Sequence, residues 1–184
     1  MNGRELVVGV TGGVAAYKTA MLVSQLVQAG AGVSVVLTES ATHFIGAATF
    51  AALTGRKVHR QGFDESDHPL GPHIDLAAKG ELLIVAPATA NFLAKVAHGA
   101  ADDLLSTLVL AFTGPVVLAP AMNNQMWDKP AVQRNVAQLR EDGYTLVGPD
   151  EGWLSCRSRA VGRMSAPEAI VEVIAERLKS LEPR

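Results

Sequence analysis

The chain has 184 residues, of which 48% are hydrophobic and 18% are charged, and its formal net charge at pH 7 is -2. This charge, without any basic run, argues against nucleic acid as the main partner, and no apolar run reaches the about 18 residues that cross a membrane. The single cysteine excludes an internal disulfide framework. The length predicts one domain, residues 1–184, and the low charged fraction indicates that self-association buries part of the surface. Because the N-terminus also lacks a basic stretch followed by an apolar core, we expect a cytoplasmic protein.

Strand and helix patterns alternate along the chain. In chain order we expect a strand at 6–10, a helix at 14–29, a strand at 33–37, a helix at 41–53, a strand at 82–86, a helix at 91–112 broken near Gly99, a strand at 116–119, a helix at 130–142, a strand at 145–147 and a helix at 167–181. Ser165 is placed to cap the last helix, and residues 60–72 are predicted to be a surface loop. The pattern predicts a single-domain, doubly wound α/β fold with a mainly parallel sheet and helices on both faces. In this architecture, ligands bind beyond the carboxyl ends of the strands.

The first predicted strand runs into a glycine-rich turn, Gly9–Lys18. Glycine lets backbone N–H groups and a helix N-terminus approach an anion, which indicates a phosphate site. The spacing matches neither the dinucleotide pattern Gly-x-Gly-x-x-Gly nor the nucleotide P-loop, so a mononucleotide is the class that remains open. A tight turn without any ligand is the alternative.

Two further turns at the same edge of the sheet are small and polar. Thr38–Thr42 follows the second strand, and Ala86–Asn91 follows the third. Each turn could be only a helix cap, but three such turns on one edge favour a site for a planar ring with a phosphate. No cluster of His, Cys, Asp or Glu has metal-ligand spacing, so no metal is expected. We interpret Asp102 and Asp103 as carboxylates at a helix N-terminus.

Residues 119–128 combine two methionines, a tryptophan and three carboxamides. Asparagine side chains can grip a carboxylate, and methionine and tryptophan can supply an apolar wall beside it. The alternative is a structured turn with Met122, Met126 and Trp127 in the core.

His73 and Cys156 are the candidates for proton transfer. A histidine suits this task near neutral pH, but position alone does not select His73 among the five histidines. Cys156 lies in a loop-like stretch, 151–164, with little apolar periodicity. This placement favours a reactive thiol, and a buried structural cysteine is the alternative.

Together these segments resemble the homo-oligomeric, flavin-containing cysteine decarboxylases over nearly the whole chain, and most closely those of coenzyme A biosynthesis. The motifs concerned are Gly12–Lys18, His73–Asp75, Ala86–Leu105, Pro120–Trp127 and Cys156 with Gly162–Met164. The pattern Pro-x-Met-Asn-x-x-Met-Trp is the most specific, because it is similar to the family's substrate-recognition motif. The resemblance implies a Rossmann-like flavoprotein fold with FMN as cofactor. It implies cofactor contacts at Gly12, Gly13, Val14, Ser40, Thr42, Phe44, Ala88, Thr89, Ala90, Asn91 and Ala121.

The same resemblance implies a role for each candidate of the active site. His73 would be the base, Asn123 would hold the substrate carboxylate, and Cys156 would be the acid. Met126 and Trp153 would bind the substrate together with Asn123, and residues near 150–165 would form a flap. Members of the family form trimers with active sites across the interface, so we expect a homotrimer or a larger assembly of trimers.

The implied reaction is the FMN-dependent decarboxylation of 4'-phospho-N-pantothenoylcysteine to 4'-phosphopantetheine. The substrate is oxidised to a thioaldehyde, CO2 leaves because the charge can move onto sulfur, and the resulting enethiol is reduced. The ligase activity that is fused to many relatives is expected on a separate chain. Arg157–Val161 departs from the Gly-Asp-x-Gly that usually follows the cysteine in relatives, which leaves the conformation of the flap open.

Three rival functions are weighed against this reaction. A peptidyl-cysteine decarboxylase releases the enethiol and needs no reducing half-reaction, so the presence of Cys156 counts against it. A non-catalytic, FMN-binding regulatory subunit would not need His73, Asn123 and Cys156 together. A mononucleotide-binding module with unrelated partners would leave residues 120–127 unexplained.

Overall fold

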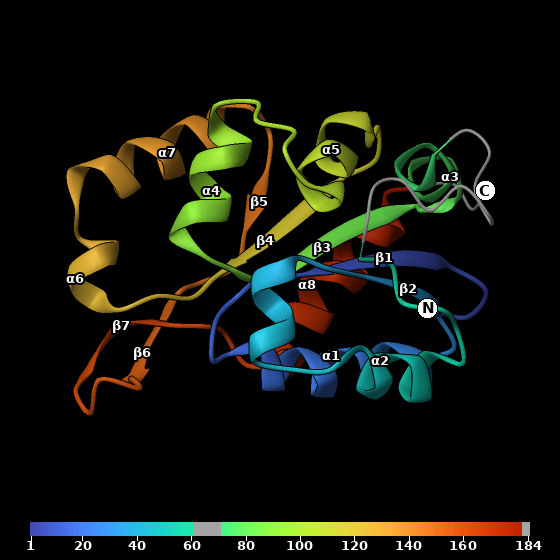
Figure 1. Ribbon diagram of the computed structural model, residues 1–184, viewed down its shortest axis with the longest axis horizontal. Helices are drawn as coiled ribbons and strands as arrows, with labels where there is room; N and C mark the ends of the chain where they lie inside the picture. Colours follow the sequence, from blue (N-terminus) through green and yellow to red (C-terminus); the bar gives the residue numbers. More distant parts are fainter. Residues whose placement is uncertain (61–70, 182–184) are drawn as a thin grey trace.

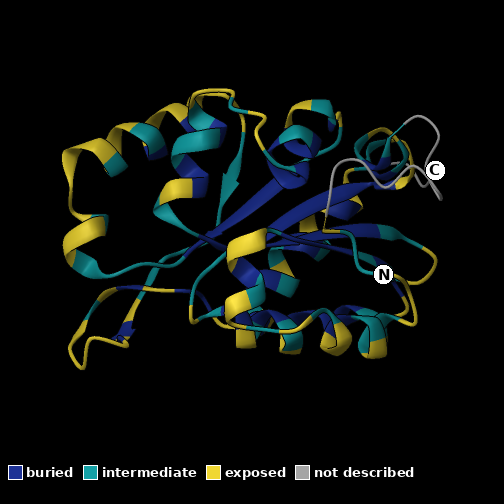
Figure 2. Cartoon of the chain, in the orientation of Figure 1, coloured by how far each residue is buried: buried dark blue, intermediate teal, exposed yellow. Residues whose placement is uncertain are grey.

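The computed structural model describes residues 1–60 and 71–181 (Figure 1). Its centre is a parallel five-stranded sheet with the order β2-β1-β3-β4-β5. The strands are β1 (Glu5–Val10), β2 (Gly32–Leu37), β3 (Leu82–Ala88), β4 (Val116–Pro120) and β5 (Thr145–Leu146). The five predicted strands are confirmed. β3 and β4 are buried along their whole length, as Figure 2 shows, because helices cover the sheet on both sides.

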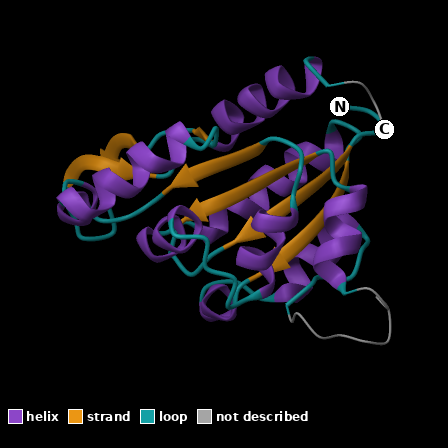
Figure 3. Cartoon of the chain, turned by 90° about the horizontal axis from the view of Figure 1, so that it is seen from above, coloured by secondary structure: helices purple, strands orange, loops and turns teal. Residues whose placement is uncertain are grey.

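Helices pack on both faces of the sheet, which confirms the doubly wound α/β fold (Figure 3). One face carries α1 (Ala16–Gln28), α2 (Ala47–Thr54) and α8 (Pro167–Lys179). The other carries α3 (Pro72–Lys79), α4 (Ala90–Ala97), α5 (Leu104–Ala111) and α7 (Pro130–Glu141). Side chains alternate along β1, so that Leu6 and Val8 join the first core cluster and Val7 joins the second. No helix in the described part of the chain is long and apolar enough to cross a membrane.

Two predicted helices are each divided. The helix expected at 41–53 is a 3-10 turn, η1 (Glu39–His43), followed by α2, and Gly46 is the N-cap of α2. The break expected near Gly99 is confirmed, because α4 and α5 flank it and Gly99 has a left-handed φ of 67°. Of the surface loop expected at 60–72, residues 61–70 lie outside the described residues. Its end is not a loop, because α3 begins at Pro72 and uses proline's fixed φ in its first turn.

The largest error concerns the loop-like stretch at 151–164. It is an antiparallel hairpin of β6 (Asp150–Trp153) and β7 (Arg159–Arg163), placed beyond the end of the sheet in Figure 1. The predicted cap of the last helix is also wrong. The N-cap residue is Ala166, and the Ser165 hydroxyl instead donates a hydrogen bond to Oδ1 of Asp150, 2.8 Å away. Ser165 therefore connects the two ends of the hairpin.

A buried ion pair connects both ends of the chain to the sheet. Nε of Arg4 lies 3.1 Å from Oε2 of Glu81, as an ion pair without hydrogen-bond alignment, and the two side chains are only 11% and 5% exposed. Oε1 of Glu81 accepts a hydrogen bond from the Glu5 amide, and Nη2 of Arg4 donates one to the Leu178 carbonyl of α8. The pair therefore joins β1, the start of β3 and α8.

We expect Arg4→Met to destabilise the fold by about 3 kcal/mol, because Glu81 would stay buried without its cation. Urea denaturation measures this loss as a lower transition midpoint. The matched control is Arg56→Met, which breaks the ion pair of Arg56 with Glu5, whose side chains are 40% and 41% exposed. That variant should lose less than about 1 kcal/mol. Equal losses in the two variants would contradict this account.

Candidate cofactor and substrate site

Three turns and the hairpin enclose one cavity of about 930 Å3. Residues that follow β1, β2, β3 and β4 line it, so it lies beyond the carboxyl ends of the strands, where the fold predicts a ligand. Most of the predicted cofactor residues line it, namely Gly12, Gly13, Val14, Ser40, Thr89, Ala90, Asn91 and Ala121. The predicted convergence of the three turns is therefore present in the structure.

Three predicted cofactor residues do not line the cavity. The Thr42 hydroxyl donates to the Glu39 carbonyl within η1, at 2.7 Å. Phe44 directs a 52% exposed side chain to the surface, and Ala88 is fully buried in β3. Their contacts with a cofactor stay predictions.

Gly12 brings the first turn against the second. A Cβ atom at Gly12 would lie 2.9 Å from the carbonyl carbon and oxygen of Ser40 and would also collide with the Ser40 Cβ. The hydroxyl of Thr11 joins the first turn to the third, because it donates to the Pro87 carbonyl at 2.6 Å and accepts from the Thr89 amide at 3.2 Å. These contacts hold the three turns close enough for one ligand to touch all of them.

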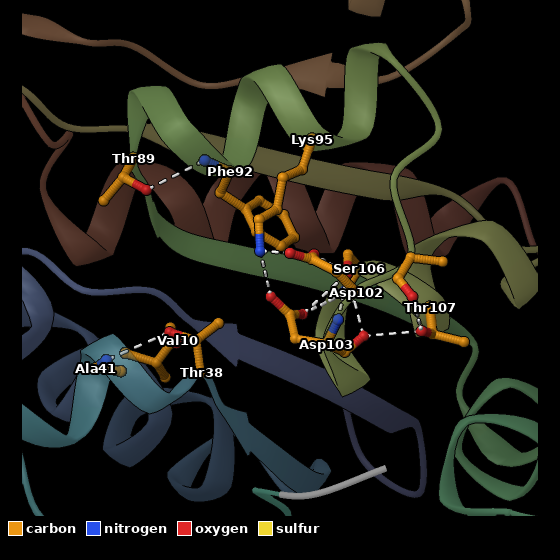
Figure 4. A network of polar contacts seen from close by, with 11 residues as sticks. Val10, Thr38, Ala41, Thr89, Phe92, Lys95, Asp102, Asp103, Ser106 and Thr107 are labelled. Carbon is orange, nitrogen blue, oxygen red and sulfur yellow. Dashed lines mark hydrogen bonds and ion pairs between the residues drawn. The ribbon is translucent and has the colours of Figure 1, made fainter.

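Thr38 and Thr89 act as helix caps and line the cavity as well. Oγ1 of Thr38 accepts a hydrogen bond from the Ala41 amide, and Oγ1 of Thr89 accepts one from the Phe92 amide, each at 3.3 Å (Figure 4). The capping interpretation of these turns is thus confirmed. Capping by these two threonines is compatible with ligand binding, because the caps fix the helix N-termini that face the cavity.

A charged network at the cavity wall was not predicted as a unit. Nζ of Lys95 lies 2.7 Å from Asp102 and 2.8 Å from Asp103, and Figure 4 shows the three side chains pointing toward one another. Burial disfavours the charged amine, but the hydrogen bonds that Lys95 donates to both aspartates outweigh it and raise the pKa of Lys95. Asp103 also forms a capping box with Ser106, which confirms the helix N-terminal interpretation. Lys95 lies in α4 and Asp103 is the N-cap of α5, so the spacing of the two residues along one helix could not predict their contact.

The segment after β4 forms the short helix α6 (Asn124–Trp127), with Asn123 as its N-cap. Oδ1 of Asn123 accepts a hydrogen bond from the Gln125 amide at 2.8 Å, which leaves the carboxamide nitrogen to donate elsewhere. Asn123 and Met126 line the cavity, and Met126 is 47% exposed. Met122 and Trp127 pack against the core, so the alternative of a core turn holds for these two residues and fails for Met126.

The hairpin docks on the segment that carries Asn123. The Met122 amide donates to the Gly162 carbonyl at 2.9 Å. Gly162 has a φ of 150°, and a side chain there would collide with the Met122 carbonyl oxygen, so the close approach requires glycine. Trp153, from the other strand of the hairpin, lines the cavity with its side chain 66% exposed. The hairpin thus lies where the resemblance places a flap.

Cys156 lies at the exposed tip of the hairpin, so the alternative of a buried structural cysteine is wrong. It does not line the cavity, although its neighbours Leu154 and Ser155 do. The Sγ atom is 3.0 Å from Oγ of Ser158. This hydrogen bond is the main cause of a lowered pKa of the Cys156 thiol, which burial opposes and the Asn123 side chain reinforces.

We expect Ser158→Ala to raise the pKa of Cys156, because the thiolate loses the group that stabilises it. The rate of alkylation by iodoacetamide should then rise with pH along a curve displaced to higher pH. Cys156 is the single cysteine of the chain, so the rate reports on it alone. An unchanged pH profile would show that Ser158 does not stabilise the thiolate.

His73 lies in the first turn of α3 and does not line the cavity of its own chain. Figure 1 places α3 at the opposite end of the molecule from the hairpin. The structure therefore brings Asn123 and the Cys156 hairpin together and leaves His73 apart. Several polar residues that line the cavity had no predicted role of their own in the site, among them Thr11, Tyr17, Lys18, Lys95 and Arg163.

Comparison with known proteins identifies the family. The Flavoprotein family matches residues 1–179. The chain belongs to this family. Its similar curated relatives include the coenzyme A biosynthesis bifunctional protein CoaBC of Bacillus subtilis, 48% identical over 173 residues, which are 94% of this chain and 43% of the relative. CoaBC of Mycobacterium tuberculosis H37Rv is 45% identical over 167 residues, which are 91% of this chain and 40% of that protein.

The chain thus spans about two fifths of the length of these curated flavoprotein relatives. Solved structures match this chain over nearly all of their own length. A PPC decarboxylase mutant complexed with pantothenoylaminoethenethiol is 30% identical, with a TM-score of 0.86 over 96% of this chain and 99% of that chain. The FMN-dependent cysteine decarboxylase SpaF is 37% identical, with a TM-score of 0.81 over 96% of this chain and 98% of that chain. These matches confirm the Rossmann-like flavoprotein fold.

Proposed function

We propose that this chain catalyses the FMN-dependent decarboxylation of 4'-phospho-N-pantothenoylcysteine (PPC) to 4'-phosphopantetheine in coenzyme A biosynthesis. The observation that carries the proposal is one cavity that joins the Gly12 turn to Asn123 and to the hairpin of Cys156. The CoaBC relatives and the PPC decarboxylase structure support this choice of reaction. A cytoplasmic location stays a prediction.

The residues of the cavity fit FMN. The tight approach of Gly12 to Ser40 leaves backbone N–H groups for a phosphate, and Ser40 and Thr89 add hydroxyl donors. Asn91 offers a carboxamide at the same wall, suited to the polar edge of a planar ring. A volume of about 930 Å3 leaves room for a substrate beside a mononucleotide. When bound, FMN supplies the acceptor and later the donor of a hydride at the substrate carbon that bears sulfur.

The residues of the chain would bind, orient and protonate the substrate. The carboxamide nitrogen of Asn123 donates to the substrate carboxylate and holds it in the orientation from which CO2 leaves. Met126 and Trp153 form an apolar wall that excludes water. Cys156 donates the proton that accompanies reduction of the enethiol, and closure of the hairpin over the cavity would bring its thiol to the substrate.

We further propose a homotrimer in which His73 of one subunit serves the cavity of the next. His73 does not line its own cavity, and the adjacent Ile74 exposes 42% of its side chain. Tyr17, which lines the cavity, and Met21, one turn further along α1, are 58% and 50% exposed. Apolar side chains of this size favour contact with another subunit over contact with water.

Coexpression of two inactive variants tests this arrangement. Trimers that mix His73→Asn with Asn123→Ala should regain decarboxylation, because some cavities then combine an intact Asn123 with an intact His73 from a neighbour. The matched control mixes Asn123→Ala with Cys156→Ser. Because Asn123 and Cys156 of one chain serve the same cavity, no cavity of these mixed trimers combines an intact Asn123 with an intact Cys156. Normal product from the control pair, or no activity from the first pair, would contradict the shared site.

A substrate comparison tests the function itself. The purified protein should be yellow and should convert PPC to a product of the mass of 4'-phosphopantetheine. SpaF, 37% identical to this chain, is an FMN-dependent cysteine decarboxylase, which favours decarboxylation of another cysteinyl compound as the second candidate. A peptide with a C-terminal cysteine is the probe for this candidate. Faster turnover of the peptide would reject PPC as the substrate. Flavin binding without turnover of either compound would favour a regulatory subunit.

A further inference from the structure

Three cationic side chains line the cavity, and they differ in their partners. Lys95 is neutralised by Asp102 and Asp103. Lys18 and Arg163 line the same cavity, and neither forms an ion pair with a carboxylate among residues 1–60 and 71–181. These two cations are therefore the positive charge that a ligand would meet.

Lys18 is held in place by the hairpin. It lies in the first turns of α1, and its Nζ donates to the Met164 carbonyl at 3.0 Å. Burial and the nearby charge of Arg163 lower the pKa of Lys18, in that order, while Asp150 and Glu168 act against this shift. Lys18 and Arg163 are thus close enough to repel each other.

The two carboxylates near Lys18 are engaged by other groups. Asp150 accepts a hydrogen bond from the hydroxyl of Ser165 at 2.8 Å, and Glu168 accepts one from the carboxamide nitrogen of Gln25 at 2.6 Å. Each carboxylate therefore weakens the positive field of Lys18 without neutralising it through direct contact. A ligand with two negative charges would remove the repulsion between the cations.

Arg163 lies on the substrate side of the cavity. Its guanidinium crosses the hairpin over Gly152, where a Cβ atom would be 2.5 Å from the Cζ of Arg163. Arg163 directly follows Gly162, whose carbonyl binds the Met122 amide next to Asn123. Arg163 thus belongs to the hairpin and Asn123 side, and Lys18 of α1 joins it through the Met164 carbonyl, which leaves the backbone N–H groups of the Gly12 turn for the cofactor phosphate.

We propose that Lys18 and Arg163 form an anion subsite that binds the 4'-phosphate of the substrate. The inference rests on the proposed function, because it assigns the phosphate end of the same substrate. A phosphate monoester is nearly a dianion at neutral pH, and a lysine with an arginine matches its charge and its oxygen acceptors. The subsite would select a phosphorylated pantothenoyl compound against an unphosphorylated one.

Binding of substrate fragments tests the subsite without turnover. Isothermal titration of the FMN-loaded protein should show 4'-phosphopantothenate binding at least about tenfold tighter than pantothenate, because a phosphate then meets two charged donors. In Lys18→Met and in Arg163→Met this preference should fall about tenfold. Lys18→Arg should keep most of it, since the charge and the donors remain. The KM for PPC should rise in both methionine variants, with kcat changed less.

The matched control is Arg159→Met, which removes an arginine that is 77% exposed, is paired with Glu151 and does not line the cavity. It should keep the full preference for the phosphorylated fragment. An equal affinity of the native protein for both fragments would overturn the proposal, and so would a full preference in both methionine variants. Loss of FMN from these variants would assign the cations to the cofactor phosphate and overturn it too. A preserved preference without turnover of PPC would reject the proposed function alone.

Discussion

Gly12→Ala is expected to yield a protein that is purified with little or no flavin. The added Cβ would lie 2.9 Å from backbone atoms of Ser40, so the first and second turns of the cavity must separate. Overpacking of this kind costs about 1–3 kcal/mol, which would correspond to a loss of FMN affinity of about fivefold to 150-fold. Titration of the apoprotein with FMN, followed by quenching of flavin fluorescence, measures the loss.

Gly46→Ala is the matched control, because a Cβ atom at Gly46 would have no neighbour within 4 Å. This variant should bind FMN as the native protein does. Circular dichroism of both variants shows whether the fold is retained. Native affinity for FMN in Gly12→Ala would mean that the cavity is not the cofactor site.

Cys156→Ser is expected to decarboxylate PPC and then stop. The enethiol needs a proton as well as a hydride to become the saturated product, and serine is far too weak an acid to replace the thiol. The released compound should be lighter than 4'-phosphopantetheine by two hydrogen atoms. The related PPC decarboxylase mutant that was solved with pantothenoylaminoethenethiol holds an enethiol of this kind.

Mass spectrometry of the products of one reaction decides the role of Cys156. Arg159→Met changes an exposed residue of the same hairpin and should give the saturated product. Saturated product at the normal rate from Cys156→Ser would show that another group donates the proton. Loss of CO2 release in Cys156→Ser would show that the thiol acts before decarboxylation.

The sheet and the cavity wall could be predicted because their signals are local. Runs such as Leu82–Ala86 are apolar and β-branched, which strands buried on both faces require. Gly99 interrupts an apolar helical pattern and has a left-handed conformation in the structure. The turns after β1, β2 and β3 could be brought together from sequence, since the carboxyl ends of parallel strands share one edge.

The hairpin could not be predicted because distant residues hold it. Its strands are largely exposed, so they lack the alternation that indicates a strand. They are stabilised by the docking of Gly162 on Met122 and by the bond between Ser165 and Asp150. The ion pair of Lys95 with Asp103 could not be predicted either, because it depends on how α4 and α5 are oriented on the two sides of the break near Gly99.

The hairpin tip has a left-handed residue at the position where the chain departs from the family pattern, Arg157. At the hairpin tip, the Arg157 amide donates to the Leu154 carbonyl, and the Leu154 amide donates to the Ser158 carbonyl. Arg157 has a φ of 61°, a left-handed conformation that glycine adopts with the least strain. The family resemblance implies glycine directly after the cysteine, and glycine would adopt this conformation with less strain than Arg157 does.

The most direct test of the central claim is the product balance of the purified flavoprotein with PPC and no added reductant. We expect one CO2 for each molecule of 4'-phosphopantetheine, over many turnovers, because the oxidation and the reduction of the substrate cancel within one cavity. Release of CO2 with an enethiol as the final product would contradict the complete cycle. Failure to consume PPC by a fully FMN-loaded protein would contradict the function.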